Sequence, residues 1–189
     1  YFSPIISFLT SLLFRWGLVD MVSIAIVSMI ISFSGYFGMY ILFKNRFNSL
    51  LSFTGVIIFG CFSIVIFNMP QGMIDLPAVA ICIWTLVFAV AAIDKNPKYF
   101  LIVFPLLVIG FFTKYIVGFA LPLILLYYLM KRDFIGNIDC LFQSPSTVKE
   151  KLTNYIKSSE FKYILISIIF SAILAVVICK TLILDYGGS

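Results

Sequence analysis

Long apolar stretches alternate with short polar breaks along most of the chain. The first clear stretch covers residues 21–43, and a second at 49–68 ends in a segment with proline and glycine that is typical of a turn. Further stretches cover residues 77–93 and 162–184. A transmembrane helix needs roughly 17–25 predominantly apolar residues. The pattern therefore predicts membrane-spanning helices.

Residues 99–130 are also apolar, but they are too long for one span. As a single helix they would measure about 48 Å, against a hydrocarbon core of about 30 Å. Basic residues stand at both ends, which requires an even number of crossings. We expect two short helices, 99–112 and 116–130, joined by a turn at Thr113-Lys114-Tyr115. Because both helices are short, the turn lies below the outer surface, and Lys114 sits in a recess lined by protein or water.

Two segments are typical of helices that lie on the membrane surface. In residues 1–17 the polar positions repeat every three or four residues, which predicts a weakly amphipathic outer helix, with a tilted span as the alternative. Its polar positions are Ser3, Ser7, Thr10, Ser11 and Arg15. Thr147-Val148-Lys149-Glu150 is a capping box that predicts an amphipathic helix on the cytoplasmic side.

Together these elements predict an all-α, polytopic transmembrane bundle with about six spans. We divide it into an outer interfacial helix (1–20), a five-span membrane core (21–133), a cytoplasmic loop with an amphipathic helix (134–161), a further span (162–184) and the start of an outer segment (185–189). The chain has no initiator methionine and stops directly after an apolar span. We therefore expect a fragment of a larger membrane protein.

Charge gives these helices a direction. Most basic residues fall into four clusters beside apolar stretches: Lys44/Arg46, Lys95/Lys98, Lys131/Arg132 and residues 149–162. Such clustering marks the cytoplasmic side of a membrane protein. The opposite ends carry few charges, namely Arg15, Lys114, Lys180, Asp20, Asp75 and Asp185. Candidate chemistry is therefore sought among these outward-facing residues.

Composition excludes several classes of protein. With 62% hydrophobic and 11% charged residues and a mean hydropathy of +1.14, the chain is not a soluble domain. Its net charge of +5 is spread between spans, which suits contact with anionic membrane lipids, and we expect no nucleic-acid partner. There is no histidine, and the four cysteines show no paired spacing. Any metal would therefore be a hard divalent cation held by carboxylate and phosphate oxygens.

Two outward charges are the strongest site candidates. Asp75, at the mouth of the 77–93 stretch, is either an N-cap or helix-dipole carboxylate, or it faces an outer cavity and binds a cation or a substrate hydroxyl. Lys114 lies between apolar helices, where a charge is costly unless it is paired or solvated. It either extends to the surface or binds a lipid-linked phosphate. Arg15 is interpreted as an interfacial anchor and Asp20 as an N-cap.

Three stretches occur in an order that resembles a known family. They are Tyr1-Phe2-Ser3-Pro4 with Arg15-Trp16-Gly17, then Asn68-Met69-Pro70 with Asp75-Leu76-Pro77, then Gly110-Phe111-Phe112-Thr113-Lys114-Tyr115 with Pro122. Their order and shared outer side resemble polyprenyl-phosphate-sugar glycosyltransferases of the GT-C class. This group includes protein O-mannosyltransferases and aminoarabinose transferases. The resemblance covers roughly residues 1–133.

The resemblance implies a sugar transfer on the outer or lumenal face of the membrane. The donor would be a polyprenyl- or dolichyl-phosphate sugar, and the acceptor a protein, lipid or glycan. In that family basic residues, and in some members a divalent cation (Mg²⁺ or Mn²⁺), hold the phosphate. Carried onto this chain, Asp75 is the catalytic acid of the second outer loop and the metal ligand, while Lys114 and Arg15 bind the donor phosphate. The family's first-loop acidic motif is absent, so it should precede Tyr1, and this fragment alone should be inactive.

Two other interpretations stay open at this level. Short, interrupted helices with a recessed charge also mark secondary transporters and lipid flippases. A non-catalytic membrane subunit would have the same composition. The expected location is the plasma membrane of a prokaryote.

Overall fold

The computed structural model describes residues 3–14, 17, 21–62, 65, 73–131 and 159–184. Within these ranges every regular element is helical, so the predicted all-α transmembrane bundle is confirmed. Among the described residues, three helices are long and apolar enough to cross a bilayer. They are α2 (Met21–Lys44), α5 (Asp75–Asp94) and α10 (Ser159–Ile178), the last continued by the π-helical η3 (Cys179–Leu184).

The other apolar helices are shorter. They are α1 (Pro4–Phe14), α3 (Ser49–Gly60), α6 (Phe100–Thr113) after the 3-10 turn η1 (Pro97–Tyr99), and α7 (Ala120–Lys131) after the 3-10 segment η2 (Tyr115–Phe119). The predicted break of residues 99–130 at Lys114 is therefore confirmed. The helix predicted over 49–68 is interrupted after Gly60, because residues 61 and 62 are not helical; residues 63, 64 and 66–68 lie outside the described residues. An apolar run indicates where a chain is buried, and it does not set where its helix ends.

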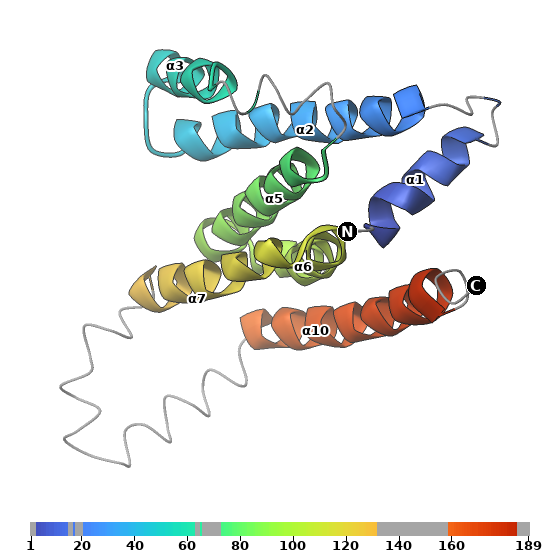
Figure 1. Cartoon of the computed structure of the whole chain (residues 1–189). Helices are drawn as coiled ribbons and strands as arrows, with labels where there is room; N and C mark the ends of the chain where they lie inside the picture. Colours follow the sequence, from blue (N-terminus) through green and yellow to red (C-terminus); the bar gives the residue numbers. More distant parts are fainter. Residues whose placement is uncertain are drawn as a thin grey trace.

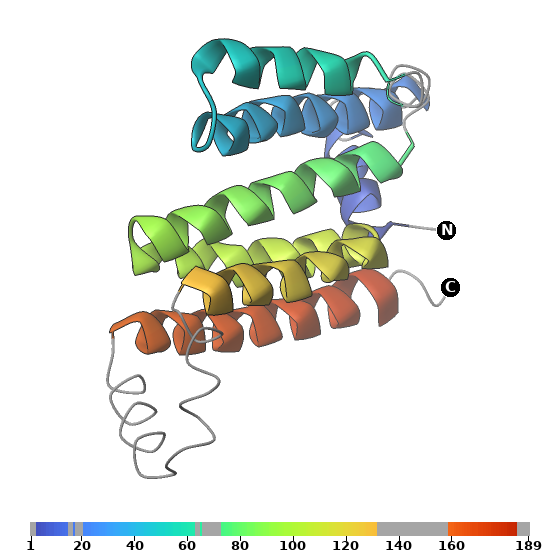
Figure 2. The ribbon, with the colours of Figure 1, turned by 90° about the vertical axis from the view of Figure 1, so that its left-hand side faces the viewer.

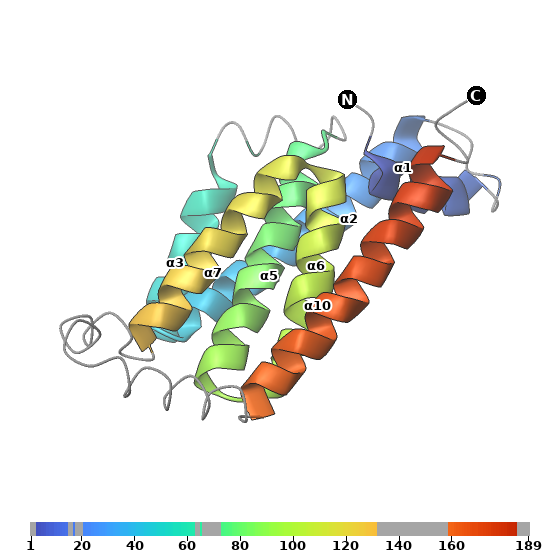
Figure 3. The same ribbon diagram turned by 90° about the horizontal axis from the view of Figure 1, so that it is seen from below.

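The helices lie side by side in an order that differs from their order along the chain. Figure 2 shows α3 at one edge, followed by α2, α5, the α6 and α7 pair, and α10 at the other edge. The most extensive contacts join α2 to α5, α5 to α6, and α6 to α10. Helix α1 crosses one end of the bundle, where it packs on α2 and α6 (Figures 1 and 3). Helix α5 is thus the central element.

Two glycines allow α2 to approach α5 closely. A Cβ placed on Gly35 would lie 2.8 Å from the Cβ of Ala80 and 3.0 Å from its Cα, which is too close for any side chain. A Cβ on Gly38 would lie 3.0 Å from Ile83. Such close approach at small residues is expected for helix packing inside a membrane.

Polarity is distributed in the opposite sense from a soluble protein. Ser52, Thr85 and Ser167 are fully buried, whereas Leu50 is 79% and Val176 is 67% exposed. The Ser167 hydroxyl donates to the backbone carbonyl of Phe100, 2.7 Å away, and so ties α10 to the start of α6. Small polar residues inside and large apolar residues outside are the arrangement that a bilayer favours.

The basic loops meet at one end of the bundle. Tyr127 of α7 donates a hydrogen bond to the Asp94 carboxylate (2.8 Å) and accepts one from the Arg46 guanidinium (3.0 Å). The Lys131 ammonium lies 3.2 Å from the same carboxylate. This inner-end network joins the α2–α3 turn to the C-terminal ends of α5 and α7. The charge rule predicts that it lies on the cytoplasmic side.

The polar positions predicted for the N-terminal helix do not share one face of α1. Ser3 and Thr10 are buried, whereas Ser7 and Ser11 are exposed, together with Phe8 (48%) and Leu12 (44%). The Thr10 hydroxyl bonds to the carbonyl of Ile6 in its own helix (2.8 Å), which satisfies it without water. The predicted cytoplasmic helix that starts at Thr147-Val148 lies outside the described residues, and α10 begins at Ser159, earlier than expected.

Candidate active site

Asp75 and Lys114 form an ion pair at the end of the bundle opposite the inner-end network. The Lys114 ammonium donates to Oδ1 of the Asp75 carboxylate. The two residues lie 39 positions apart in the chain, and they are brought together because α5 packs along α6. The Lys114 side chain is 31% exposed and that of Asp75 is 52% exposed. Both charged groups are therefore accessible to solvent at this end of the bundle.

The structure excludes an N-cap role for Asp75. The N-cap of α5 is Ile74, which makes no side-chain capping bond. Asp75 is the first helical residue, where the positive end of the helix dipole favours a negative charge. Its carboxylate contacts the Lys114 ammonium, so the N-cap interpretation is wrong and the helix-dipole contribution remains.

The backbone at Lys114 explains how the chain breaks inside an apolar environment. Lys114 is extended (φ −156°, ψ 128°) between α6 and η2. Its N–H donates to the carbonyl of Gly110 (2.8 Å), and its carbonyl accepts from the N–H of Val117 (3.1 Å). Irregular backbone at membrane depth must satisfy its own polar groups. Both backbone groups are satisfied within the turn, which leaves the side chain to reach Asp75.

Gly110 makes that turn possible. A Cβ at this position would lie 2.5 Å from Cγ1 of Val117 and 3.0 Å from Cγ2 of Ile81. Only glycine allows η2 to fold back this closely against α6, with α5 packed on the other side. The glycine of the Gly110-to-Tyr115 motif therefore has a structural reason: it sets the position of Lys114.

Asp75 is held from the α2 side. The buried Ser28 hydroxyl donates to the carbonyl of Met73 at 3.1 Å, two residues before Asp75. This bond fastens the segment that enters α5 to the middle of α2. The sequence did not single out Ser28. In the sequence Ser28 is one of several small residues within a predicted span. Nothing in that pattern distinguishes it from Ser32, whose hydroxyl bonds to a carbonyl of its own helix.

Of the other candidates, Arg15, Asp20 and Asp185 lie outside the described residues. Lys180 belongs to η3, which packs on α10 and α1, and the structure does not bring it into the Asp75–Lys114 pair. The described residues contain no group of three acidic or cysteine side chains that could hold a metal ion. A lone carboxylate already paired with an ammonium is a poor site for a divalent cation, so the metal role of Asp75 gains no support here.

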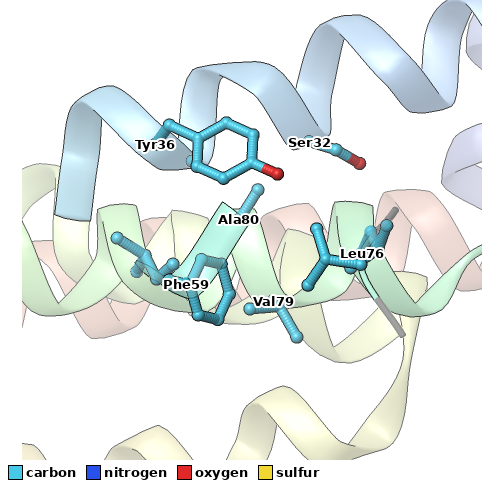
Figure 4. A pocket seen from close by; sticks show the side chains of 9 residues that line it. Ser32, Tyr36, Phe59, Leu76, Val79 and Ala80 are labelled. Carbon is cyan, nitrogen blue, oxygen red and sulfur yellow. The ribbon is translucent and has the colours of Figure 1, made fainter. Parts of the chain in front are cut away.

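Two hollows lie close to α5. A cavity of about 10 Å³ between α2, α3 and α5 has room for about one water molecule. Its lining includes Ser32, Tyr36 and Phe59, as Figure 4 shows. This volume excludes a sugar.

The second hollow is an apolar groove of about 310 Å³, lined from α2, α5 and α6, with Trp84 on its wall. Trp84 follows Asp75 by nine residues, or about two and a half helical turns. Trp84 therefore lies about 13 Å from Asp75 along the axis of α5.

Residues 2–138 match the family described as dolichyl-phosphate-mannose-protein mannosyltransferase. The chain belongs to this family. The matched region includes both members of the ion pair and the Gly110 turn. No curated protein and no solved structure matched the chain.

Family membership makes the chain a membrane glycosyltransferase of the mannosyltransferase-like class. It favours this class over the transporter, flippase and non-catalytic alternatives that composition left open. The all-α bundle, with apolar residues on its outside, is the structural setting of that class in this chain.

Proposed function

We propose that the protein transfers a sugar from a polyprenyl- or dolichyl-phosphate carrier to an acceptor on the outer face of the membrane, at the Asp75–Lys114 pair. The observation that carries the proposal is this pair of opposite charges, accessible to solvent and placed at the outer end of two membrane helices. The family supplies the donor class, since its description names a dolichyl-phosphate sugar. The acceptor is a protein, lipid or glycan.

The chemistry of sugar transfer needs both kinds of charge. The bond between the anomeric carbon and the phosphate oxygen breaks, and the phosphate leaves with the bonding electrons. An ammonium such as that of Lys114 neutralises the negative charge on the departing phosphate. The acceptor hydroxyl forms the new bond to the anomeric carbon and loses its proton. A carboxylate such as that of Asp75 accepts this proton or orients the hydroxyl.

Each residue should therefore affect a different kinetic constant. Lys114→Ala removes a charge-assisted contact worth about 1.5–3 kcal/mol, which corresponds to a loss of about 10- to 150-fold in donor affinity. Asp75→Asn keeps the shape of the side chain and removes its basicity. General acid–base groups contribute about 10²–10⁴-fold to rate, so kcat should fall within that range.

The test is transfer of radiolabelled mannose from dolichyl-phosphate mannose in membranes from cells that express the complete open reading frame. Lys98→Ala is the matched control, because it removes a lysine at the opposite end of the bundle. Transfer at the wild-type rate by both Asp75→Asn and Lys114→Ala would show that the pair is structural and would refute the assignment.

Cellular location and metal dependence complete the proposal. The clusters of basic residues orient the Asp75 end away from the cytoplasm, and we place the protein in the plasma membrane of a prokaryote. A divalent cation, Mg²⁺ or Mn²⁺, stays a prediction for the donor phosphate. Its check is transfer activity after chelation and after readdition of each ion.

A further inference from the structure

We propose that the Asp75–Lys114 ion pair is a resting contact that the donor replaces. The phosphate of the donor takes over the Lys114 ammonium, and this exchange releases the Asp75 carboxylate for the acceptor hydroxyl. The inference rests on the proposed function and adds an order of events to it: the acid-base group becomes available only after the leaving group is bound.

The charges of the intact pair do not favour binding of a phosphate. A lysine ammonium is a single compact positive charge, and in the structure it is directly paired with the Asp75 carboxylate. The pair has no net charge with which to attract a phosphate. A phosphate that approached the intact pair would also meet the negative carboxylate. A phosphate in contact with Lys114 would lie next to the Asp75 carboxylate, and the two negative charges would repel each other. Favourable contact between phosphate and ammonium therefore requires that the Asp75 carboxylate separate from Lys114.

The geometry of the reaction also requires that the two side chains separate. In a direct displacement, the acceptor hydroxyl and the leaving phosphate oxygen stand on opposite sides of the anomeric carbon. The groups that serve them are correspondingly separated: in inverting glycosidases the two catalytic carboxyl groups are about 6.5–9.5 Å apart. An ammonium in direct contact with the carboxylate leaves no room for a sugar carbon between them. Productive binding of the donor therefore separates Asp75 from Lys114.

The structure holds the backbone of both partners in place and leaves the lysine side chain free to rotate. The backbone of Lys114 is held by its bonds to Gly110 and Val117, and the segment before Asp75 is held by the bond from Ser28. The lysine side chain, in contrast, has four flexible methylene groups and is 31% exposed. The exchange therefore needs a rotation of this side chain and no movement of a helix.

The carboxylate that is left behind retains a favourable environment. Asp75 is the first residue of α5, where the positive end of the helix dipole stabilises a negative charge. It is also 52% exposed, so water replaces the ammonium as its partner. Separation of the pair consequently does not strand a buried charge, which is the situation that makes broken ion pairs costly.

The experiment measures binding of farnesyl phosphate, a short polyprenyl phosphate, to the purified full chain in detergent by calorimetry. Farnesol reports the apolar contribution alone, and inorganic phosphate reports the anion alone. The variants are Asp75→Asn, Lys114→Ala and the double substitution. Lys114→Met, which keeps most of the apolar stem, serves as a second variant if Lys114→Ala does not fold.

If exchange occurs, Asp75→Asn binds farnesyl phosphate more tightly than wild type, by about fivefold if the competing contact has the strength of a part-exposed ion pair. Its kcat falls while its KM for the donor also falls. The Lys114→Ala variant binds farnesyl phosphate more weakly than wild type. Adding Asp75→Asn to that variant raises the affinity less than it does in the wild type, because no ammonium is left for which carboxylate and phosphate compete. Farnesol affinity is the same in every variant.

Other results separate the two proposals. Weaker binding by Lys114→Ala, together with unchanged or weaker binding by Asp75→Asn, would overturn the exchange and leave the phosphate site in place. Unchanged farnesyl phosphate binding in Lys114→Ala would overturn the phosphate site and the exchange together. Equal effects on inorganic phosphate and farnesyl phosphate would show that any phosphate triggers the exchange, whereas an effect on farnesyl phosphate alone assigns the trigger to the lipid-linked donor.

Discussion

Gly110→Ala should destabilise the protein although alanine is the better helix former. The added Cβ would lie 2.5 Å from Cγ1 and 3.1 Å from Cβ of Val117, and 3.0 Å from Cγ2 of Ile81. Relaxed carbon contacts are about 3.5–4.0 Å. Val117 is only 1% exposed, so it has no free space to move into. Segment η2 must shift away from α6 by about 1 Å to restore a normal contact.

The expected cost follows from two opposing effects. Extra volume in a packed site typically costs about 1–3 kcal/mol. Replacement of glycine by alanine within a helix returns about 1 kcal/mol. The net loss is therefore up to about 2 kcal/mol. Lys114 lies between α6 and η2, so their separation also moves its ammonium relative to Asp75. We expect sugar transfer to fall together with stability.

The assay compares Gly110→Ala in the wild-type and Val117→Ala backgrounds by thermal unfolding in detergent. Removal of the valine methyl groups relieves the closest contact and leaves those at 3.0 and 3.1 Å, so Gly110→Ala should cost clearly less stability there. Gly118→Ala is the matched control, since its Cβ would meet only the Phe111 ring, at 3.4 Å, which is an ordinary contact. An equal loss from Gly110→Ala in both backgrounds would refute the steric explanation.

Three further outcomes are expected elsewhere in the bundle. Tyr127→Phe removes the hydroxyl at the centre of the inner-end network, whose hydrogen bonds are solvent-exposed. It should lower stability by about 0.5–1.5 kcal/mol, seen in thermal unfolding, with the affinity for farnesyl phosphate at the other end of the bundle unchanged. Ser28→Ala should lower transfer activity more than Ser32→Ala, because only Ser28 fastens the segment before Asp75; equal activities would argue against this positioning role. In a cysteine-free background, Met73→Cys should react with a membrane-impermeant maleimide from outside and Lys98→Cys only after permeabilisation, and the reverse pattern would overturn the orientation.

The sequence by itself determined the class of fold, and it predicts the direction of the helices. Runs of apolar residues have lengths set by bilayer thickness, and clusters of lysine and arginine mark one side. The division of residues 99–130 into two helices followed from the same length argument, and α6 and α7 bear it out. These properties are local: each depends on one segment and on the solvent around it, so a linear pattern is enough to reveal them.

Only the tertiary structure decided which residues meet. Asp75 and Lys114 were separate candidates, and their direct pairing depends on how α5 and α6 pack. The bond from Ser28 and the inward orientation of Thr10 in α1 were likewise not predicted. The physical reason lies in the membrane: a helix that is apolar on every side carries no polar stripe to show which face is buried. Close contacts at small residues such as Gly35 and Gly110 set the rotation of each helix instead, and these contacts exist only once the neighbouring helix is in place.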